Sequence, residues 1–196
     1  MFYNFAKFII KPLVYLFFRP KVEGIHHIPA EGKAIVYSNH ISFLDPIVIG
    51  CLLPRPISFM AKAELFKNPL LRWIIKHLGA FPVKRGTADL SAIKNALQVL
   101  KEGKIFGIFP EGTRSRTGEL LNFSHGIASI AHRSKAKIIP ITITNGYTLF
   151  KPITVRIGKP LDFDRYFNQK SNTQLLEQMV EEMEAAIKSL QNCGNE

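Results

Sequence analysis

Cysteine is scarce in this sequence. Only Cys51, in an apolar run, and Cys193, near the end of the chain, occur among 196 residues. Two cysteines this far apart provide neither a disulfide framework nor the ligand spacing of a zinc site. We therefore expect Cys51 to be a small buried side chain, and we expect a reducing compartment and no metal site.

Acidic residues are also scarce. The chain holds 15 Asp and Glu against 26 Lys and Arg, a net charge of +11, and no acidic residue precedes Glu23. Such an excess indicates an anionic partner: nucleic acid, an acidic protein, a phosphorylated substrate or an anionic bilayer. No recognisable nucleic-acid-binding motif accompanies the charge, so we expect no nucleic-acid partner.

The chain also lacks an uninterrupted apolar segment long enough for a transmembrane helix. Residues 1–18 are rich in Phe, Leu and Ile, but Lys7, Lys11 and Pro12 interrupt them short of the ~20 apolar residues that a spanning helix needs. The charged start and cleavage site of a signal peptide are missing as well. We predict an amphipathic helix in the membrane interface over residues 1–20, and hence a peripheral membrane protein at the cytoplasmic face of the cell membrane. The alternative is a helix packed on the protein's own core.

Residues 21–196 show no internal repeat, low-complexity tract or linker, and their length suits one domain. Strand-like apolar runs alternate with helix-like segments. The predicted strands cover residues 21–24, 34–38, 57–61, 79–83, 105–109, 137–144 and 153–157, and the predicted helices 46–53, 68–77, 88–102, 126–134 and 173–190. This alternation predicts a single α/β domain whose mixed, mostly parallel central sheet is flanked by helices.

The connection between the strand at 34–38 and the following helix carries His40 and Asp45. Such connections often hold the chemistry of α/β folds. The two side chains can meet only in a compact turn, which Asp45 as helix N-cap and Pro46 as first helical residue would favour. Asp45 could then bind one ring nitrogen of His40 and leave the other free as a base. A merely structural ion pair is the alternative.

A second candidate site is the segment 109–118, which follows another predicted strand. Gly112 permits a close backbone approach, Thr113 and Ser115 supply hydroxyls, and Arg114 presents a planar fork suited to phosphate oxygens. The Gly-x-x-x-x-Gly-Lys-Ser/Thr pattern of a Walker loop is absent. The segment therefore indicates an anion-binding loop, with a basic surface turn as the alternative.

Two further basic residues, Lys62 and Arg85, also come soon after predicted strands. Loops at the carboxyl ends of parallel strands converge on one crevice. If the strands run parallel, His40, Lys62, Arg85 and Arg114 share that crevice.

These segments together resemble a known family, the glycerolipid acyltransferases. In order and spacing, the family's sequence blocks are similar to Asn39-His40-x4-Asp45, Lys62-Ala63-Glu64-Leu65, Val83-Lys84-Arg85, Phe109-Pro110-Glu111-Gly112-Thr113-Arg114-Ser115 and Ile139-Pro140-Ile141. The resemblance runs from about Ser38 to Ile141. One departure is Lys84, since relatives often carry an acidic residue there.

The resemblance implies transfer of an acyl chain from an acyl thioester, carried by acyl carrier protein or coenzyme A. The acceptor would be the sn-2 hydroxyl of a lysophosphatidate (1-acyl-glycerol-3-phosphate), and the product phosphatidate. His40 would be the general base and Asp45 would hold its tautomer, without a covalent acyl-enzyme, a metal or a cofactor.

The resemblance also implies where the acceptor's phosphate binds. It would lie against Arg114 and the backbone amides of Gly112 and Thr113, with Lys62 and Arg85 nearby. Glu111 would orient the arginine or the glycerol hydroxyls.

Other functions remain open. A member of the same family could act on another lyso-lipid or on glycerol-3-phosphate, and a non-enzymatic membrane- or nucleic-acid-binding protein would use the same positive charge. An esterase or lipase would need a Gly-x-Ser-x-Gly nucleophile elbow, which the sequence lacks.

Overall fold

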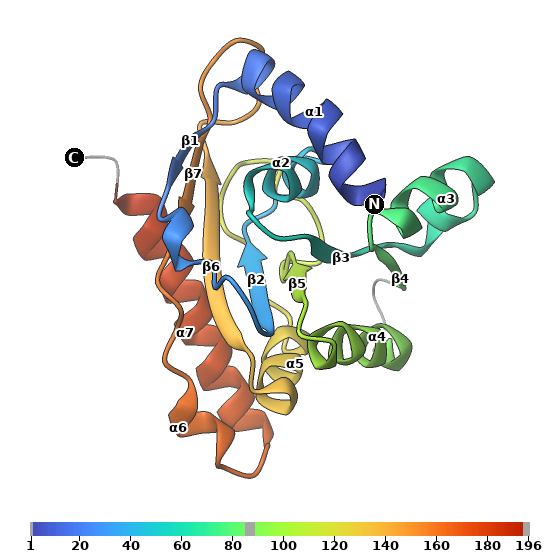
Figure 1. Cartoon of the computed structure of the whole chain (residues 1–196). Coiled ribbons are helices and arrows are strands. Elements are labelled where there is room, and N and C mark those ends of the chain that lie inside the picture. Colours follow the sequence, from blue (N-terminus) through green and yellow to red (C-terminus); the bar gives the residue numbers. More distant parts are fainter. Residues whose placement is uncertain (1, 85–88, 194–196) are drawn as a thin grey trace.

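The computed structural model describes residues 2–84 and 89–193 (Figure 1). Its centre is a seven-stranded sheet with the order β1-β7-β6-β2-β5-β3-β4. The strands are β1 (Lys21–Glu23), β2 (Ala34–Ser38), β3 (Ile57–Lys62), β4 (Phe81–Val83), β5 (Ile105–Ile108), β6 (Lys137–Thr144) and β7 (Thr154–Ile157). The helices are α1 (Phe2–Phe18), α2 (Asp45–Leu52), α3 (Pro69–His77), α4 (Leu90–Lys101), α5 (Gly126–Ser134), α6 (Asp164–Phe167) and α7 (Thr173–Asn192), with 3-10 turns η1 (Ile25–His27) and η2 (Ala63–Phe66).

The sheet is parallel from β6 through β2, β5 and β3 to β4, and only the pairing of β6 with β7 is antiparallel among the described strand pairs. At its centre, Ala34 of β2 pairs with Ile105 of β5 on one side and Lys137 of β6 on the other. Every residue of β2 and β5 is buried, as expected for central parallel strands. The carboxyl ends of β2, β3, β5 and β6 therefore meet at one edge of the sheet.

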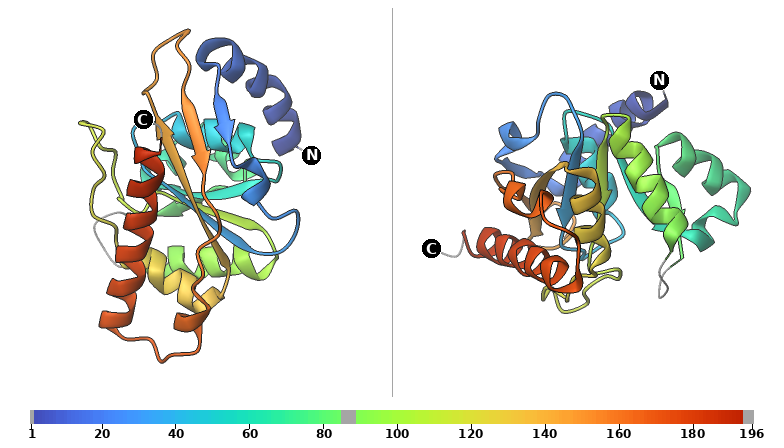
Figure 2. Two further views of the ribbon diagram at one scale, coloured as in Figure 1. Left: turned by 90° about the vertical axis from the view of Figure 1, so that its left-hand side faces the viewer. Right: turned by 90° about the horizontal axis from the view of Figure 1, so that it is seen from below.

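Helices cover both faces of this sheet (Figure 2). Alternate residues of β2 point to opposite faces, so Ile35 and Tyr37 join one core cluster and Ala34 and Val36 the other. The first cluster includes buried residues of α4, α5 and α7, and the second includes those of α1 and α2. The single, mostly parallel α/β domain expected from the sequence is confirmed.

Side-chain caps explain where three helices begin. Asn68, Asp89 and Asn172 precede α3, α4 and α7 and accept hydrogen bonds from amides of the first turn. In α2, by contrast, Leu44 is the N-cap and Asp45 is the first helical residue. The expectation that Asp45 caps α2 is therefore wrong, because its carboxylate turns back to the preceding loop.

The observed elements lie within a few residues of the predicted ones. The start predicted for α4, residue 88, is outside the described residues, and the helix begins at Leu90. The sequence carries no periodic signal for η2 and α6, because four residues are too few to show one.

The N-terminal helix α1 exposes many of its apolar side chains. Within α1, all of whose residues are described, only Val14 is buried, while the ring of Phe8 is 78% exposed. Lys7 points inward and donates a hydrogen bond to the carbonyl of Leu53. In residues 2–84 and 89–193, no helix has both the length and the apolar character needed to cross a bilayer.

Candidate active site

His40 and Asp45 meet in the turn after β2. Nδ1 of His40 lies 2.8 Å from Oδ2 of Asp45, and the Asp45 side chain is fully buried. The same oxygen accepts hydrogen bonds from the backbone amides of Ile41 and Ser42, at 2.8 and 2.9 Å. These amides close the compact turn that the spacing of the two residues requires, so the contact predicted between His40 and Asp45 is confirmed.

The backbone of His40 is held by the segment after β5. Its amide donates to Oε1 of Glu111 at 2.6 Å, and its carbonyl accepts from the amide of Ser115 at 2.8 Å. Oε2 of Glu111 accepts from the amide of Leu121 at 3.1 Å. Both carboxylate oxygens of Glu111 thus accept from backbone amides. The role expected for it, orienting Arg114 or the glycerol hydroxyls, stays a prediction.

Burial of Glu111 has an electrostatic consequence. Desolvation raises the pKa of its carboxyl, although the hydrogen bonds from the His40 and Leu121 amides oppose the rise. A carboxylate that accepts two amide hydrogen bonds is a rigid link between the two sequence motifs. Glu111 thereby fixes the backbone of His40, the residue that carries the imidazole.

Aromatic stacking fixes the plane of the imidazole. The His40 ring stacks on Phe109, with centroids 4.1 Å apart, and Phe109 stacks in turn on Phe59. Because Asp45 engages Nδ1, Nε2 is the ring nitrogen available to a substrate.

Asn39 joins the ends of β2 and β6. Its side-chain amide donates to the carbonyl of Ile143 at 3.0 Å and accepts from the Ile143 amide at 2.9 Å. The side chain of Asn39 therefore continues the pairing of the two strands and supports the turn that begins with His40. Its place beside His40 in the sequence was the only signal that could have suggested this role.

Tyr147, in the β6–β7 connection, is a site residue that the sequence did not suggest. Its hydroxyl and Oδ1 of Asp45 are, within the described ranges, buried oxygens without a well-formed hydrogen bond. Burial, and next the Asp45 carboxylate, raise the pKa of the phenol. Tyr147 is therefore a neutral hydroxyl beside Asp45. Its position three residues after a strand parallel to β2 was the available signal.

A cavity of about 540 Å³ adjoins His40. Its lining is mainly apolar and comes from α1, α2, β3 and α3. Lys62 and Arg114 line the same cavity, so the structure brings these two predicted residues together with His40. Lys62 is about half exposed, and its Nζ lies 3.6 Å from Oε1 of Glu64. Arg85, predicted for the same crevice, lies outside the described residues.

The predicted anion loop, residues 109–118, begins with a tight turn at Gly112. Gly112 adopts a φ of +67°, a left-handed conformation that favours glycine, and its amide donates to the carbonyl of Phe109 at 3.1 Å. In this structure the turn itself uses this amide, and its expected contact with phosphate stays a prediction. Thr113 and Arg114 are exposed, and only Arg114 of the two lines the cavity. In the part of the chain that the structure describes, no three His, Cys, Asp or Glu side chains are grouped to hold a metal ion.

Comparison with known proteins places this site in a family. Residues 19–144 match the acyltransferase family model. The chain is 34% identical to 1-acyl-sn-glycerol-3-phosphate acyltransferase of Bacillus subtilis (strain 168), covering 97% of each protein. It is 32% identical to LPAT1, a chloroplastic protein of Arabidopsis thaliana with the same activity name, over 66% of this chain and 37% of that one.

A solved crystal structure supports the same family assignment. The crystal structure of 1-acyl-sn-glycerophosphate (LPA) acyltransferase, PlsC, from Thermotoga maritima is similar to this fold, with a TM-score of 0.72 and 29% identity. The match covers 97% of this chain and 78% of that one. The family model spans both His40 and the segment that holds its backbone, and it covers well over half of the sequence. The chain therefore belongs to the acyltransferase family and is an acyltransferase.

Proposed function

We propose that this enzyme transfers an acyl chain from an acyl thioester of acyl carrier protein or coenzyme A to the sn-2 hydroxyl of 1-acyl-glycerol-3-phosphate, forming phosphatidate. The observation that carries the proposal is one mainly apolar cavity that also presents His40, Lys62 and Arg114. Such a cavity suits a molecule with a reacting hydroxyl, a phosphate and a hydrocarbon chain.

His40 acts as the general base. Nε2 takes the proton of the acceptor hydroxyl while the hydroxyl oxygen attacks the carbonyl carbon of the thioester. Asp45 keeps the Nδ1 proton in place and stabilises the imidazolium that forms. When the carbon–sulfur bond breaks, the leaving thiolate takes the proton from Nε2, which returns His40 to its starting state.

The two ends of the acceptor bind to different parts of the site. The acyl chain lies along the apolar lining, which includes Ile10 of α1 and Leu71 of α3. The phosphate binds Arg114, whose guanidinium can hold two of its oxygens, with Lys62 as a second positive charge. The donor is anionic in either form, which suits a chain of net charge +11.

The enzyme works as a peripheral membrane protein on the cytoplasmic face of the cell membrane, where its lipid acceptor and product reside. The outward face of α1 supports this part of the proposal, since Phe5, Phe8, Ile9, Leu13 and Leu16 are all exposed. A soluble surface rarely exposes a continuous apolar patch of this kind. A helix with such a face and basic neighbours lies in the interface of a bilayer.

The test is acyl transfer from labelled acyl carrier protein and acyl-CoA, side by side, to lysophosphatidate and to glycerol-3-phosphate in anionic vesicles. The proposal expects phosphatidate from lysophosphatidate and none in the His40→Ala variant. Product from glycerol-3-phosphate alone, or only from another lyso-lipid, would overturn the acceptor assignment and leave the family assignment intact.

A further inference from the structure

The helix α3 carries apolar side chains that the protein does not cover. None of the residues of α3, which are all described, is buried. Leu71 and Ile75 face the cavity, whereas Leu70 is 69% exposed and Trp73 is 50% exposed. A nine-residue helix is too short to be stable alone, and helices in proteins normally bury an apolar face. Among the residues that the structure describes, Phe2 packs on Trp73, but the outward face formed by Leu70 and Trp73 stays largely uncovered.

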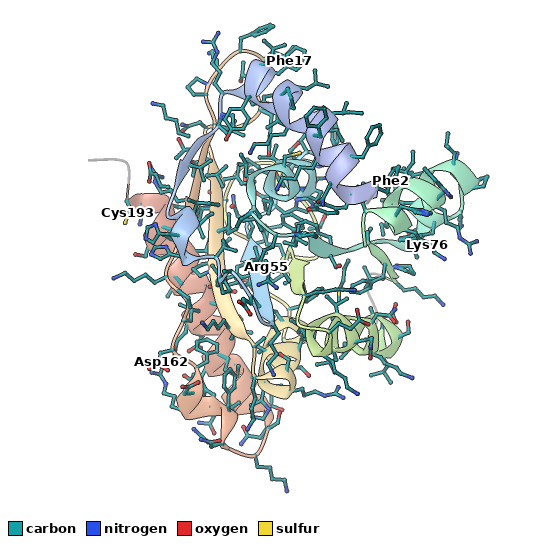
Figure 3. The ribbon with its side chains drawn as sticks, in the orientation of Figure 1. Phe2, Phe17, Arg55, Lys76, Asp162 and Cys193 are labelled. Atoms are coloured by element: carbon teal, nitrogen blue, oxygen red, sulfur yellow. The ribbon has the colours of Figure 1, made fainter. Side chains whose placement is uncertain are left out.

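This face continues the exposed face of α1. The ring of Phe2 meets the ring of Trp73 edge to face, with centroids 5.0 Å apart. Figure 3 shows Phe2 at the end of α1 that lies beside α3, and Lys76 on α3. Leu65 of η2 is exposed next to α3 in the sequence. We call the exposed apolar side chains of α1, η2 and α3 the lipid face.

The positive charges on and next to α3 indicate an anionic partner. Arg72 and Lys76, one helical turn apart, are exposed, and Lys67 just before the helix is exposed as well. The helix contains no acidic residue. In α3 the cations lie beside the exposed leucine and tryptophan, and exposed apolar and basic side chains side by side on one helix are typical of helices that bind anionic bilayers. Each such cation near an anionic surface adds to the attraction.

The cavity lies between the two helices. Tyr3, Ala6 and Ile10 of α1 line it from one side, and Leu71 and Ile75 of α3 from the other. A hydrocarbon chain that leaves the bilayer between α1 and α3 would enter a mainly apolar cavity that His40 also lines.

We infer that α3 is a second membrane-contacting helix, which inserts Leu70 and Trp73 among anionic lipids. Together α1 and α3 flank the route by which lipid chains enter the cavity. This inference rests on the proposed membrane binding of α1 and adds to it a second element, with its own residues.

The chain offers a direct probe, because Trp73 is its only tryptophan. The full chain is mixed with vesicles of phosphatidylglycerol and phosphatidylcholine, and tryptophan emission is recorded together with co-sedimentation. We expect a blue shift on binding and strong quenching when the lipid chains are brominated. If the chain sediments with vesicles while its emission and quenching stay unchanged, the inference fails and the role of α1 stands. If the chain does not sediment, membrane binding itself fails, and the inference with it.

A matched pair of variants provides a second test. Leu70→Glu places a charge on the lipid face, and Leu90→Glu places the same charge at the start of α4, where the leucine is 74% exposed. We expect Leu70→Glu to weaken vesicle binding about tenfold, and Leu90→Glu to leave it unchanged. Both variants should keep their activity on detergent-dispersed lysophosphatidate, since Leu70 does not line the cavity. Equal vesicle binding by the two variants would refute the inference.

Discussion

The backbone amide of His40 donates a hydrogen bond to the carboxylate of Glu111 across 2.6 Å. The two residues are 71 positions apart in the chain. The contact joins the turn after β2 to the turn after β5, two strands that pair in the centre of the sheet. Glu111 therefore holds the backbone of His40 in place.

Glu111→Gln should lower kcat more than it changes KM for the acceptor. A glutamine side chain has one acceptor oxygen, so one of the amides of His40 and Leu121 would face an NH2 group instead. An amide left without its acceptor costs about 1–3 kcal/mol. Steady-state kinetics would show the split, and circular dichroism would check the fold. A variant in which KM rises and kcat is unchanged would instead place Glu111 against the substrate.

His40→Ala should abolish turnover while the chain stays folded. Asp45→Asn should reduce kcat by about 10³–10⁴-fold, because an amide at this position favours the wrong imidazole tautomer. Both variants can be assayed with labelled acyl thioester and checked by thermal unfolding. Turnover that survives in folded His40→Ala would remove the histidine from the mechanism.

Tyr147→Phe removes the neutral hydroxyl beside Asp45. We expect kcat to fall by no more than about three- to tenfold, because the hydroxyl lies beside the Asp45 carboxylate without a well-formed hydrogen bond and so adds only part of the roughly 1.5–3 kcal/mol that such a bond is worth. KM for the acceptor should change little, since Tyr147 does not line the cavity. A phenylalanine variant with wild-type kcat would show that Asp45 holds its orientation through His40, Ile41 and Ser42 alone.

Arg114→Ala should raise KM for the lysophosphatidate acceptor and reduce kcat/KM by about 30- to 150-fold, which corresponds to the ~2–3 kcal/mol of a charge-assisted hydrogen bond. Arg116→Ala is the matched control. Arg116 is exposed, belongs to the same loop and does not line the cavity. Equal losses in the two variants would indicate a general effect of positive charge rather than a phosphate contact.

Asp89 gives a prediction about pH. Hydrogen bonds from the Lys84 amide, then from the Ser91 hydroxyl and the Ala92 amide, lower the pKa of its carboxyl from 3.8 to about 2. Because the folded-state pKa is depressed, the ionised cap stabilises the fold above the ordinary pKa, and this contribution is lost as the pH falls towards 2. Asp89→Ala should thus cost about 1 kcal/mol of unfolding free energy near neutral pH and less at about pH 3.

Urea unfolding at the two pH values measures this difference. Asp89→Asn is the control, since its amide oxygen can still cap α4. An equal loss for Asp89→Ala at both pH values would contradict the link between the ionised carboxylate and the helix cap.

Local features of the sequence were enough to predict the framework. Runs such as Ala34–Ser38 and Ile105–Ile108 are apolar throughout, which is typical of strands buried on both faces. Asn68 followed by Pro69 marks the start of a helix. The contact between His40 and Asp45 was also predictable, because both residues lie in one short turn.

Long-range contacts were not predictable in the same way. The amide partners of Glu111 come from His40 and Leu121, and the hydroxyl beside Asp45 comes from Tyr147. The sequence around Glu111 is the same whether its carboxylate contacts the substrate or the backbone, so the sequence alone does not distinguish the two. Only the packing of β2, β5 and β6 side by side decides which group it meets.

The sequence by itself determined the alternation of strands and helices, the turn that pairs His40 with Asp45, and the family motifs, because each depends on residues close together in the chain. The tertiary structure alone decided which side of α1 and α3 faces outward, how Glu111 is used, and which side chains line the cavity. Those features depend on which surfaces remain uncovered once distant segments pack, and hydrophobic residues look alike in a sequence whether they cover a core or face a membrane.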